Sequence, residues 1–218
     1  MKKKRQRERT TRIFIESAAE IIRTEGIEAL TIRKVADIAA YNSATLYNYF
    51  DNLEHLKSLT ALTFIADYTS SLDDCIKDCK NAYEINEAVW LNFYRYTYRL
   101  PKIYHSIFGN SVSKSHNSYI NEFYTLFPEH LADTSEKVKG MLVEENLLDR
   151  TMFLLNECAK EDYFATEDLE EIYELLFFIY QGMLNRLLTC EVCFTEDEFV
   201  EKARVYNNKI FMGYKKTT

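Results

Sequence analysis

Residues 31–51 constrain the fold of this chain most, because they place two short helical patterns on either side of a tight turn. Apolar residues recur at helical spacing behind Thr31, which is a suitable N-cap for the first of these helices. The turn AAYNS follows, and Asn42 or Ser43 can cap a further helix that ends near Asp51. The segment therefore predicts two helices that pack against each other across a turn.

Another amphipathic helix is expected before this segment, over residues 10–25, and Gly26 ends it. Its apolar residues fall at i, i+4, i+7 and i+8: Phe14, Ala18, Ile21 and Ile22. Three short helices with a tight turn between the second and the third are the sequence form of a helix-turn-helix.

Successive residues of an α-helix are rotated by about 100° around its axis. This rotation gives the last of the three helices one bulky face and one slim face. The bulky face packs inward and carries Leu46, Tyr49 and Phe50. The slim face carries Ala44 and Asn48, with Thr45 and Tyr47 on its flanks. Tyr47 is expected at the edge, with its ring on the protein and its hydroxyl outward. A face this slim fits a DNA major groove, and its hydroxyl and amide groups can bond phosphates and base edges.

Basic residues gather at the start of a chain that is acidic elsewhere. Residues 1–57 carry 11 Lys and Arg against 8 Asp and Glu (+3), and the remainder carries 16 against 26 (−10), which gives the net charge of −7. Seven basic residues lie within the first twelve, with only Glu8 against them. Such a run is often a solvated tail, but on an acidic protein it suggests an arm that meets a polyanion.

The segment LTIRKVADIAAYNSATLYNYFDNLEHL (residues 30–56), preceded by RIFIESAAEIIRTEG, resembles the DNA-binding domain of the TetR family of bacterial transcriptional regulators. The family pattern is an initial helix, T-x-R-x-[IV]-A, a turn, T-L-Y-x-[YH]-F and a following E-x-L. The matching positions are Thr31, Arg33, Val35, Ala36, Thr45, Leu46, Tyr47, Tyr49, Phe50, Glu54 and Leu56. The rest of the chain resembles the family in helical architecture only.

The resemblance implies that this region binds double-stranded operator DNA. Tyr47 would bond a backbone phosphate, and Thr31 and Arg33 would contact phosphate or a base edge. The residues implied at or in the major groove are Asn42, Ser43, Ala44, Thr45 and Asn48. Because the recognition helix is nearly uncharged, the basic arm, including Lys3, Lys4 and Arg5, should supply more of the affinity than usual.

Two positions depart from the family pattern. The turn commonly reads A-G-V-S, whereas Ala40 replaces the glycine here and Tyr41 replaces the small aliphatic residue. Glycine takes a positive φ freely, and alanine takes it only at some cost. Leu53 stands where the family often has a lysine, which removes one phosphate contact, although the helix N-terminus behind Asn52 can still donate its amides.

The composition of the whole chain predicts an all-α fold. Only 5 Gly and 2 Pro in 218 residues leave little material for turn-rich β structure. We expect an N-terminal DNA-binding domain over 1–52 and a helical ligand-binding and dimerisation domain over 53–218. A long helix over 53–79 would connect them. The further helices are expected near 84–99, 102–108, 115–127, 135–160, 167–190 and 196–215.

The last two helices carry apolar stripes wider than one core needs, and Thr195 with Glu198 fits a capping box before the final helix. In the family the corresponding pair forms a four-helix dimer interface, and a homodimer is therefore implied. The expected interface residues are Tyr173, Leu176, Tyr180, Leu184, Leu187, Phe199, Tyr206 and Ile210.

The segment VWLNFYRYTYRLPKIYHSIF (residues 89–108) is dense in aromatic residues. Such density is more often core than ligand site, but an apolar pocket with a few hydroxyls also suits a small molecule, and the family binds inducers or co-repressors in this region. A largely apolar effector is expected. The candidate contacts are Phe64, Tyr68, Trp90, Tyr94, Tyr104, His105 and Phe123.

Enzyme chemistry is not indicated, since the sequence contains no P-loop, G-x-S-x-G or H-E-x-x-H. We expect no catalytic residue, cofactor or metal. Two cysteine pairs, Cys75 with Cys79 and Cys190 with Cys193, each supply only two ligands and are expected to be buried or incidental.

No apolar segment follows the basic start, and LLFFIY (175–180) is too short to cross a bilayer, so a cytoplasmic protein is expected. The leading hypothesis is a ligand-responsive homodimeric DNA-binding regulator, and a repressor is expected rather than an activator. The alternatives are a helical interaction module that has lost DNA binding and an all-α enzyme.

Overall fold

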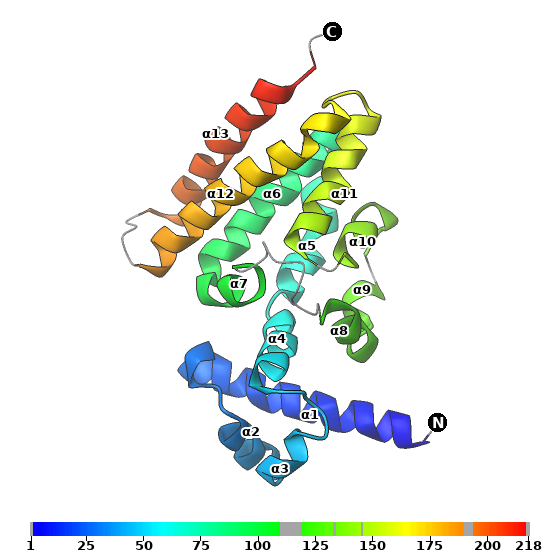
Figure 1. The fold of residues 1–218 in the computed structure, drawn as a ribbon, viewed down its shortest axis with the longest axis vertical. Helices are drawn as coiled ribbons and strands as arrows, with labels where there is room; N and C mark the ends of the chain where they lie inside the picture. Colours follow the sequence, from blue (N-terminus) through cyan, green and yellow to red (C-terminus); the bar gives the residue numbers. More distant parts are fainter. Residues whose placement is uncertain (1, 110–118, 133, 145, 190–193, 217–218) are drawn as a thin grey trace. The chain divides into compact units, whose positions relative to one another are not determined.

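The computed structural model describes residues 2–109, 119–132, 134–144, 146–189 and 194–216. Over these residues the chain forms α-helices and short 3-10 helices and contains no strand (Figure 1). This confirms the all-α fold class. The chain divides into two compact units. The first comprises residues 1–66 and 117–129, and the second comprises 67–116 and 130–218.

The first unit is larger than the N-terminal domain expected over 1–52, because the helix after residue 52 and a segment from the second half of the chain pack with it. The functional division at residue 52 stays a prediction. The helices of this unit are α1 (Lys2–Glu25), η1 (Ile27–Ala29), α2 (Ile32–Ala39), α3 (Ser43–Leu46), α4 (Leu53–Thr63) and α8 (Ile120–Leu126).

The helix α1 is longer than the expected 10–25, because the basic arm is helical from Lys2 onward. The arm contains neither glycine nor proline, and Lys, Arg, Gln and Glu are good helix formers. The apolar face of α1 forms the centre of the unit. Phe14, which is fully buried, meets the rings of Tyr41 at 5.0 Å and Tyr49 at 5.3 Å between centroids, both edge to face.

Side-chain caps fix the ends of the short helices. The hydroxyl of Thr31 accepts a hydrogen bond from the amide of Lys34 at 3.2 Å, as its predicted N-cap role requires. The side chain of Asn42 likewise accepts from the amide of Ala44 at 2.8 Å. The helix α3 ends at Leu46 in a turn over 47–49, earlier than expected, because the chain must become extended at Asn52, which caps α4.

The single helix expected over 53–79 is two helices, α4 and α5 (Ala66–Ile76), separated by a turn at 64–65. Threonines lie at the end of α4. The Thr60 hydroxyl donates to the Leu56 carbonyl at 2.7 Å and the Thr63 hydroxyl to the Thr60 carbonyl at 2.7 Å. Such bonds compete with the helical ladder and favour a bend or an end. The break lies next to the boundary between the units.

The second unit is built around α6 (Ala82–Arg99), which packs against α11, α12 and α13 (Figure 1). The expected helix over 135–160 is two helices, because the side chain of Asn146 caps a new one by accepting from the amide of Asp149 at 2.9 Å. The other elements are α7 (Pro101–Phe108), α10 (Glu136–Leu142), α11 (Leu147–Lys160), η2 (Thr166–Asp168), α12 (Leu169–Leu188) and α13 (Glu196–Tyr214), with α9 (Glu129–Ala132) at the unit boundary.

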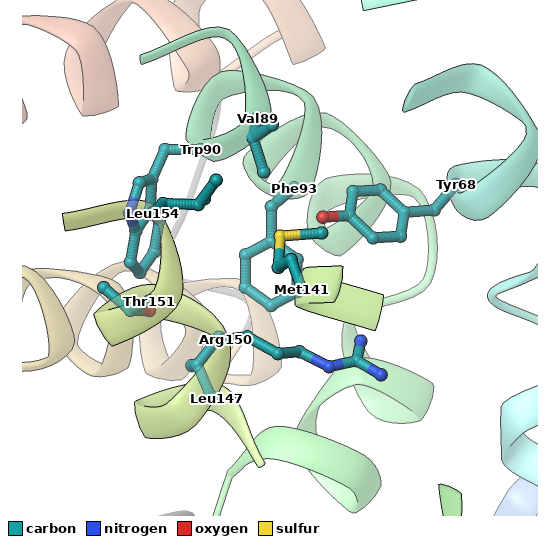
Figure 2. A pocket seen from close by; sticks show the side chains of 9 residues that line it. All are labelled: Tyr68, Val89, Trp90, Phe93, Met141, Leu147, Arg150, Thr151 and Leu154. Atoms are coloured by element: carbon teal, nitrogen blue, oxygen red, sulfur yellow. The ribbon is translucent and has the colours of Figure 1, made fainter. Parts of the chain in front are cut away.

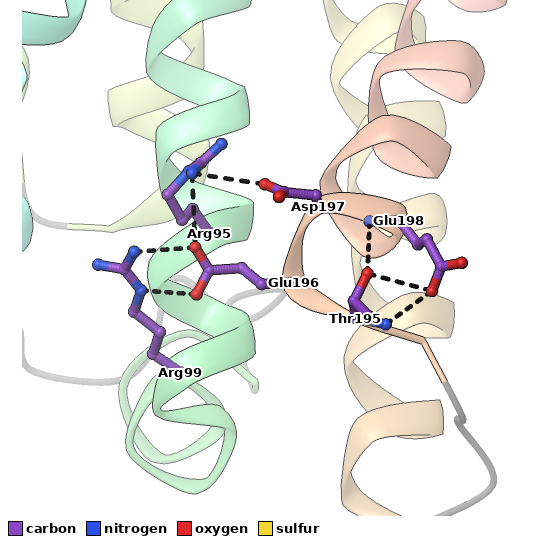
Figure 3. A network of polar contacts seen from close by, with 6 residues as sticks. All are labelled: Arg95, Arg99, Thr195, Glu196, Asp197 and Glu198. Atoms are coloured by element: carbon purple, nitrogen blue, oxygen red, sulfur yellow. Dashed lines mark hydrogen bonds and ion pairs between the residues drawn. The ribbon is translucent and has the colours of Figure 1, made fainter.

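Polar contacts at the start of α13 fix it against α6 (Figure 3). The predicted capping box of Thr195 and Glu198 is present. Arg99 binds both carboxylate oxygens of Glu196, with Nε and Nη2 each at 2.8 Å, and these bonds lower the pKa of Glu196. Arg95 lies 3.8 Å from Asp197. The first turn of α13 is therefore held by two arginines of one neighbouring helix.

Candidate nucleic-acid interface and ligand cavity

The two tyrosines around α3 have opposite environments. Tyr47 is 63% exposed, whereas Tyr49 is half-buried against Phe14, with the guanidinium carbon of Arg7 5.0 Å from its ring centroid. Leu46 is fully buried. The outward face carries Ala44 and Asn48, both exposed, and the half-buried Thr45 and Ser43. The result is a slim surface of small and polar side chains with one phenol at its edge.

The turn between α2 and α3 keeps a left-handed residue although it lacks glycine. Ala40 has φ 57° and ψ 42°, and the amide of Tyr41 donates to the carbonyl of Ala36 at 2.9 Å. An L-residue pays about 1–2 kcal/mol for this conformation. The ring of Tyr41 packs on Phe14, so the residue that replaces the family's small aliphatic side chain adds contact to the core.

The start of α2 presents two further predicted residues to solvent. Thr31 and Arg33 are both exposed. The oxygen of Thr31 accepts the capping bond, and its O–H is still able to donate. Asn42, also exposed, uses its carbonyl oxygen as a cap and keeps its amide group as a donor. Leu53 is the first residue of α4, behind the cap Asn52.

The basic arm lies in the first turns of α1, where Lys3, Lys4 and Arg5 are exposed. The first turn contains no acidic residue, so these cations face the positive end of the helix dipole and weaken the helix slightly. A bound polyanion would relieve that repulsion. The last arginine of the run, Arg12, is not available in the same way, because it forms an ion pair with Glu129 and donates to the carbonyl of Leu126 at 2.7 Å.

The helix α8 is fixed to α4 through a buried histidine. His55 is 5% exposed, and its Nδ1 accepts from the amide of Asp51 at 3.2 Å. In the neutral ring Nε2 then carries the hydrogen and donates to Glu122, 3.0 Å away. The ring of Tyr119 stacks on His55 with centroids 4.2 Å apart. Together with the contacts of Arg12, these bonds attach α8 to the helix-turn-helix unit.

The second unit contains a small cavity of about 20 Å³, room for roughly one water molecule (Figure 2). Its walls come from α5, α6, α10 and α11. The lining residues are Tyr68, Val89, Trp90, Phe93, Met141, Leu147, Arg150, Thr151 and Leu154. Figure 2 shows the hydroxyl of Tyr68 pointing inward toward Met141 and Phe93.

The predicted ligand contacts are only partly brought together. Tyr68 and Trp90 line the cavity. Tyr94 and Tyr104 are fully buried without lining it, and burial raises the pKa of both hydroxyls, for which the described residues supply no hydrogen-bond partner. His105 is exposed. The other two, Phe64 and Phe123, belong to the first unit and do not line the cavity.

Sequence reasoning missed the residues that α11 supplies, although a signal was present. Arg150 interrupts an apolar stripe of that helix, with Leu147 three residues before it and Leu154 four residues after it. A charged residue on an apolar stripe indicates either a specific buried partner or a binding site.

The predicted dimer residues are mostly internal to one chain. Leu176, Tyr180, Leu184 and Phe199 have at most 1% of their surface exposed, and Tyr173 is also buried. Leu187 and Ile210 are half-buried and Tyr206 is exposed. The buried side chains cannot also contact a second copy. The large apolar residues that α12 and α13 do expose are Leu175, Phe178, Val205, Tyr206 and Met212.

Burial disfavours the thiolate form of the described cysteines. Burial raises the pKa of both Cys75 and Cys158 to about 12, and burial also raises the pKa of Cys79. Cys190 and Cys193 lie outside the described residues. In the part of the chain that the structure describes, no three His, Cys, Asp or Glu side chains gather as a metal site would require. Nor does any helix there have the length and apolarity to cross a membrane.

Known proteins match this chain in one segment by sequence and over nearly its whole length by fold. Residues 14–56 match the family described as "Bacterial regulatory proteins, tetR family". No curated protein matches the sequence.

Three solved structures illustrate the likeness in fold. A TetR family transcription regulator from Marinobacter aquaeolei VT8 has TM-score 0.52 and 16% identity, with 100% of both chains covered. The fatty acid degradation regulator FadR from Bacillus halodurans has TM-score 0.54 and 15% identity, with 94% of this chain and 95% of that chain covered. A protein of unknown function from Rhodococcus sp. RHA1 has TM-score 0.62 and 15% identity, with 95% and 96% covered.

The matched segment spans the end of the buried face of α1, the capped helix α2, the turn and α3, which are the parts that form the exposed polar face described above. A DNA-binding regulator fold accounts for both the motif and the helical architecture. The sequence match therefore places residues 14–56 with the N-terminal domain of the tetR family of bacterial regulatory proteins, and the solved structures share the helical fold over nearly the whole chain.

Proposed function

We propose that this chain is a cytoplasmic transcriptional repressor that binds operator DNA as a homodimer and is released by a small hydrophobic effector. The observation that carries the proposal is the outward face of α3, where Ala44, Thr45 and Asn48 form a slim polar surface with Tyr47 at its edge. Side chains of this size let a helix enter the major groove, and the Tyr47 hydroxyl is placed to bond a phosphate.

Exposed residues at the start of α1 and of α2 supply the remaining contacts in this proposal. Thr31, Arg33 and the arm residues Lys3, Lys4 and Arg5 are all exposed and would lie along the phosphate backbone. Because α3 itself carries no charged residue, the arm would supply most of the salt-dependent affinity.

Dimerisation in this proposal uses the exposed faces of α12 and α13 rather than their buried ones. On α12, Leu175 and Phe178 are exposed three residues apart, and on α13 Val205 and Met212 are exposed seven residues apart. These spacings place each pair on one side of its helix. Phe178 and Met212, with 64% and 61% of their surfaces exposed, would gain most from burial against a second copy.

Two connections can carry a signal from the cavity to α3. One is the α4–α5 turn at 64–65, next to the unit boundary. The other is α8, which belongs to the first unit while the chain before residue 117 and after residue 129 belongs to the second. Because His55 and Arg12 bind α8, a ligand that moves the second unit would pull on the helix-turn-helix unit through it.

A gel-shift assay against the DNA upstream of the protein's own coding region tests the proposal. We expect that DNA to be retarded at concentrations at which an equally long coding fragment is not. Retardation of neither fragment would favour an interaction module without DNA binding. Equal retardation of both would contradict sequence-specific regulation.

A further inference from the structure

The cavity of the second unit contains one cation, which restricts the chemistry of what it can bind. Arg150 is 4% exposed, yet it lines the cavity together with apolar side chains (Figure 2). Its Nε donates to the Glu144 carbonyl at 3.2 Å and its Nη2 to the Leu142 carbonyl at 2.8 Å. A guanidinium has five N–H donors, so these bonds to the end of α10 leave donors unused.

The charge of Arg150 is not balanced by an acidic side chain in the described part of the chain. No described carboxylate forms an ion pair with it, and the lining of the cavity includes neither Asp nor Glu. Backbone carbonyls offset part of the cost of burying the cation, but they bring no opposite charge. An anion inside the cavity would supply both the missing charge and acceptors for the unused donors.

We propose that the effector is a hydrophobic monocarboxylic acid whose carboxylate binds Arg150 and whose apolar body lies against Trp90, Phe93 and Leu154. This assignment rests on the proposed function. A carboxylate matches the single positive charge and the planar fork of the guanidinium. A phosphate monoester, with a charge between about −1.5 and −2, would leave surplus negative charge in an apolar cavity. The hydroxyls of Tyr68 and of Thr151, one residue along α11, are further polar groups in the lining.

Binding requires the cavity to open, because its volume of about 20 Å³ is too small for an organic acid. Met141 is the adaptable part of the wall. It is an unbranched side chain on α10, a helix of 7 residues. Displacement of Met141 would extend the space toward the same helix end to which Arg150 is bonded.

The test uses the emission of Trp90, the only tryptophan of the chain, which lies in the cavity wall. Full-length protein is titrated with two matched pairs below their micelle concentrations: decanoate with decanol, and 4-butylbenzoate with 4-butylbenzyl alcohol. In at least one pair we expect the acid to bind about 10- to 100-fold more tightly than its alcohol, the effect of a hydrogen bond to a charged group.

Two substitutions of Arg150, one of Met141 and one control separate the anion site from a structural role of Arg150. Arg150→Met should abolish the preference for the acid while the alcohol still binds within about threefold of wild type, and Arg150→Lys should keep part of the preference. Met141→Ala should tighten binding of acid and alcohol alike. Lys160→Met, an exposed change on the same helix, should alter nothing.

Equal binding of acid and alcohol to the wild type, binding of none of the four probes, or a preference that survives in Arg150→Met would each overturn the inference. Operator binding is measured in parallel by DNA anisotropy. An acid that binds through Arg150 but leaves operator affinity unchanged would contradict the proposed repressor release and not the anion site.

Discussion

At the scale of single residues, Ala40 shows how the helix-turn-helix survives without its usual glycine. The residue stays left-handed at φ 57°, and the strain is offset by the packing around it. Ala40→Gly should therefore stabilise the first unit by about 0.5–1 kcal/mol, the relief of αL strain less the extra chain entropy of glycine. Thermal unfolding of the full chain would measure the change.

A neighbouring alanine provides the control for this prediction. Ala39 lies in the last turn of α2. Ala39→Gly should destabilise by about 0.5–1 kcal/mol, because there glycine only loosens a helix. Equal destabilisation by both substitutions would contradict the strained-turn account of Ala40.

Substitutions of the two tyrosines after α3 should have separate effects, one on DNA affinity and the other on thermal stability. Tyr47→Phe removes one exposed hydroxyl and should lower the affinity for all DNA sequences by about 1 kcal/mol, with thermal stability unchanged. Tyr49→Ala removes the ring that packs on Phe14 and should cost a few kcal/mol of stability. Anisotropy with labelled DNA and thermal unfolding measure the two effects, and similar losses of stability in both variants would rule out this assignment of faces.

At the scale of elements, α8 is the feature that most needs a test. Arg12→Met removes the ion pair with Glu129 and the bond to Leu126 that attach this segment to α1. We expect the variant to bind operator DNA and to retain the Trp90 response, but to lose at least about half of the effector's influence on DNA affinity, since coupling depends on differential contacts in the two states. Lys57→Met, on α4, is the matched control. An unchanged coupling in Arg12→Met would exclude α8 from signal transmission.

The sequence predicted local elements well and long-range partners poorly. The caps Thr31 and Asn42 and the faces of α3 depend on neighbours within a few residues, so periodicity and capping rules locate them. The break at 64–65 has a local signal in Thr60 and Thr63, whose hydroxyls compete with the helical ladder, and periodicity alone does not show it. The attachment of α8 depends on contacts such as Arg12 with Glu129, 117 residues apart, which no local pattern contains. The cavity was partly missed for the same reason, because α11 brings Arg150 to Trp90 only in the folded unit.

At the scale of the whole molecule, we expect contrasting effects of a charge at an exposed and at a buried position of α12 if the chain forms the proposed dimer. Phe178→Glu places a charge on an exposed apolar face, so it should weaken dimerisation by at least about 100-fold without unfolding the chain. Leu184→Glu buries a charge inside one chain and should prevent folding. Sedimentation at micromolar concentration distinguishes these results, with Glu174→Gln as an exposed control. A wild-type monomer under those conditions would exclude the homodimer.

The central claim is that one conformational change links the cavity to DNA binding. A ligand can release DNA only to the extent that it binds the released state more tightly, so occupancy of the cavity and loss of DNA binding must follow the same curve. The most direct measurement titrates the operator complex with the hydrophobic acids while Trp90 emission and the anisotropy of labelled DNA are recorded in one sample. We predict that both signals change over the same concentration range and that Trp90→Phe, followed by anisotropy alone, shifts that range. A change in Trp90 emission at constant DNA anisotropy would contradict the account.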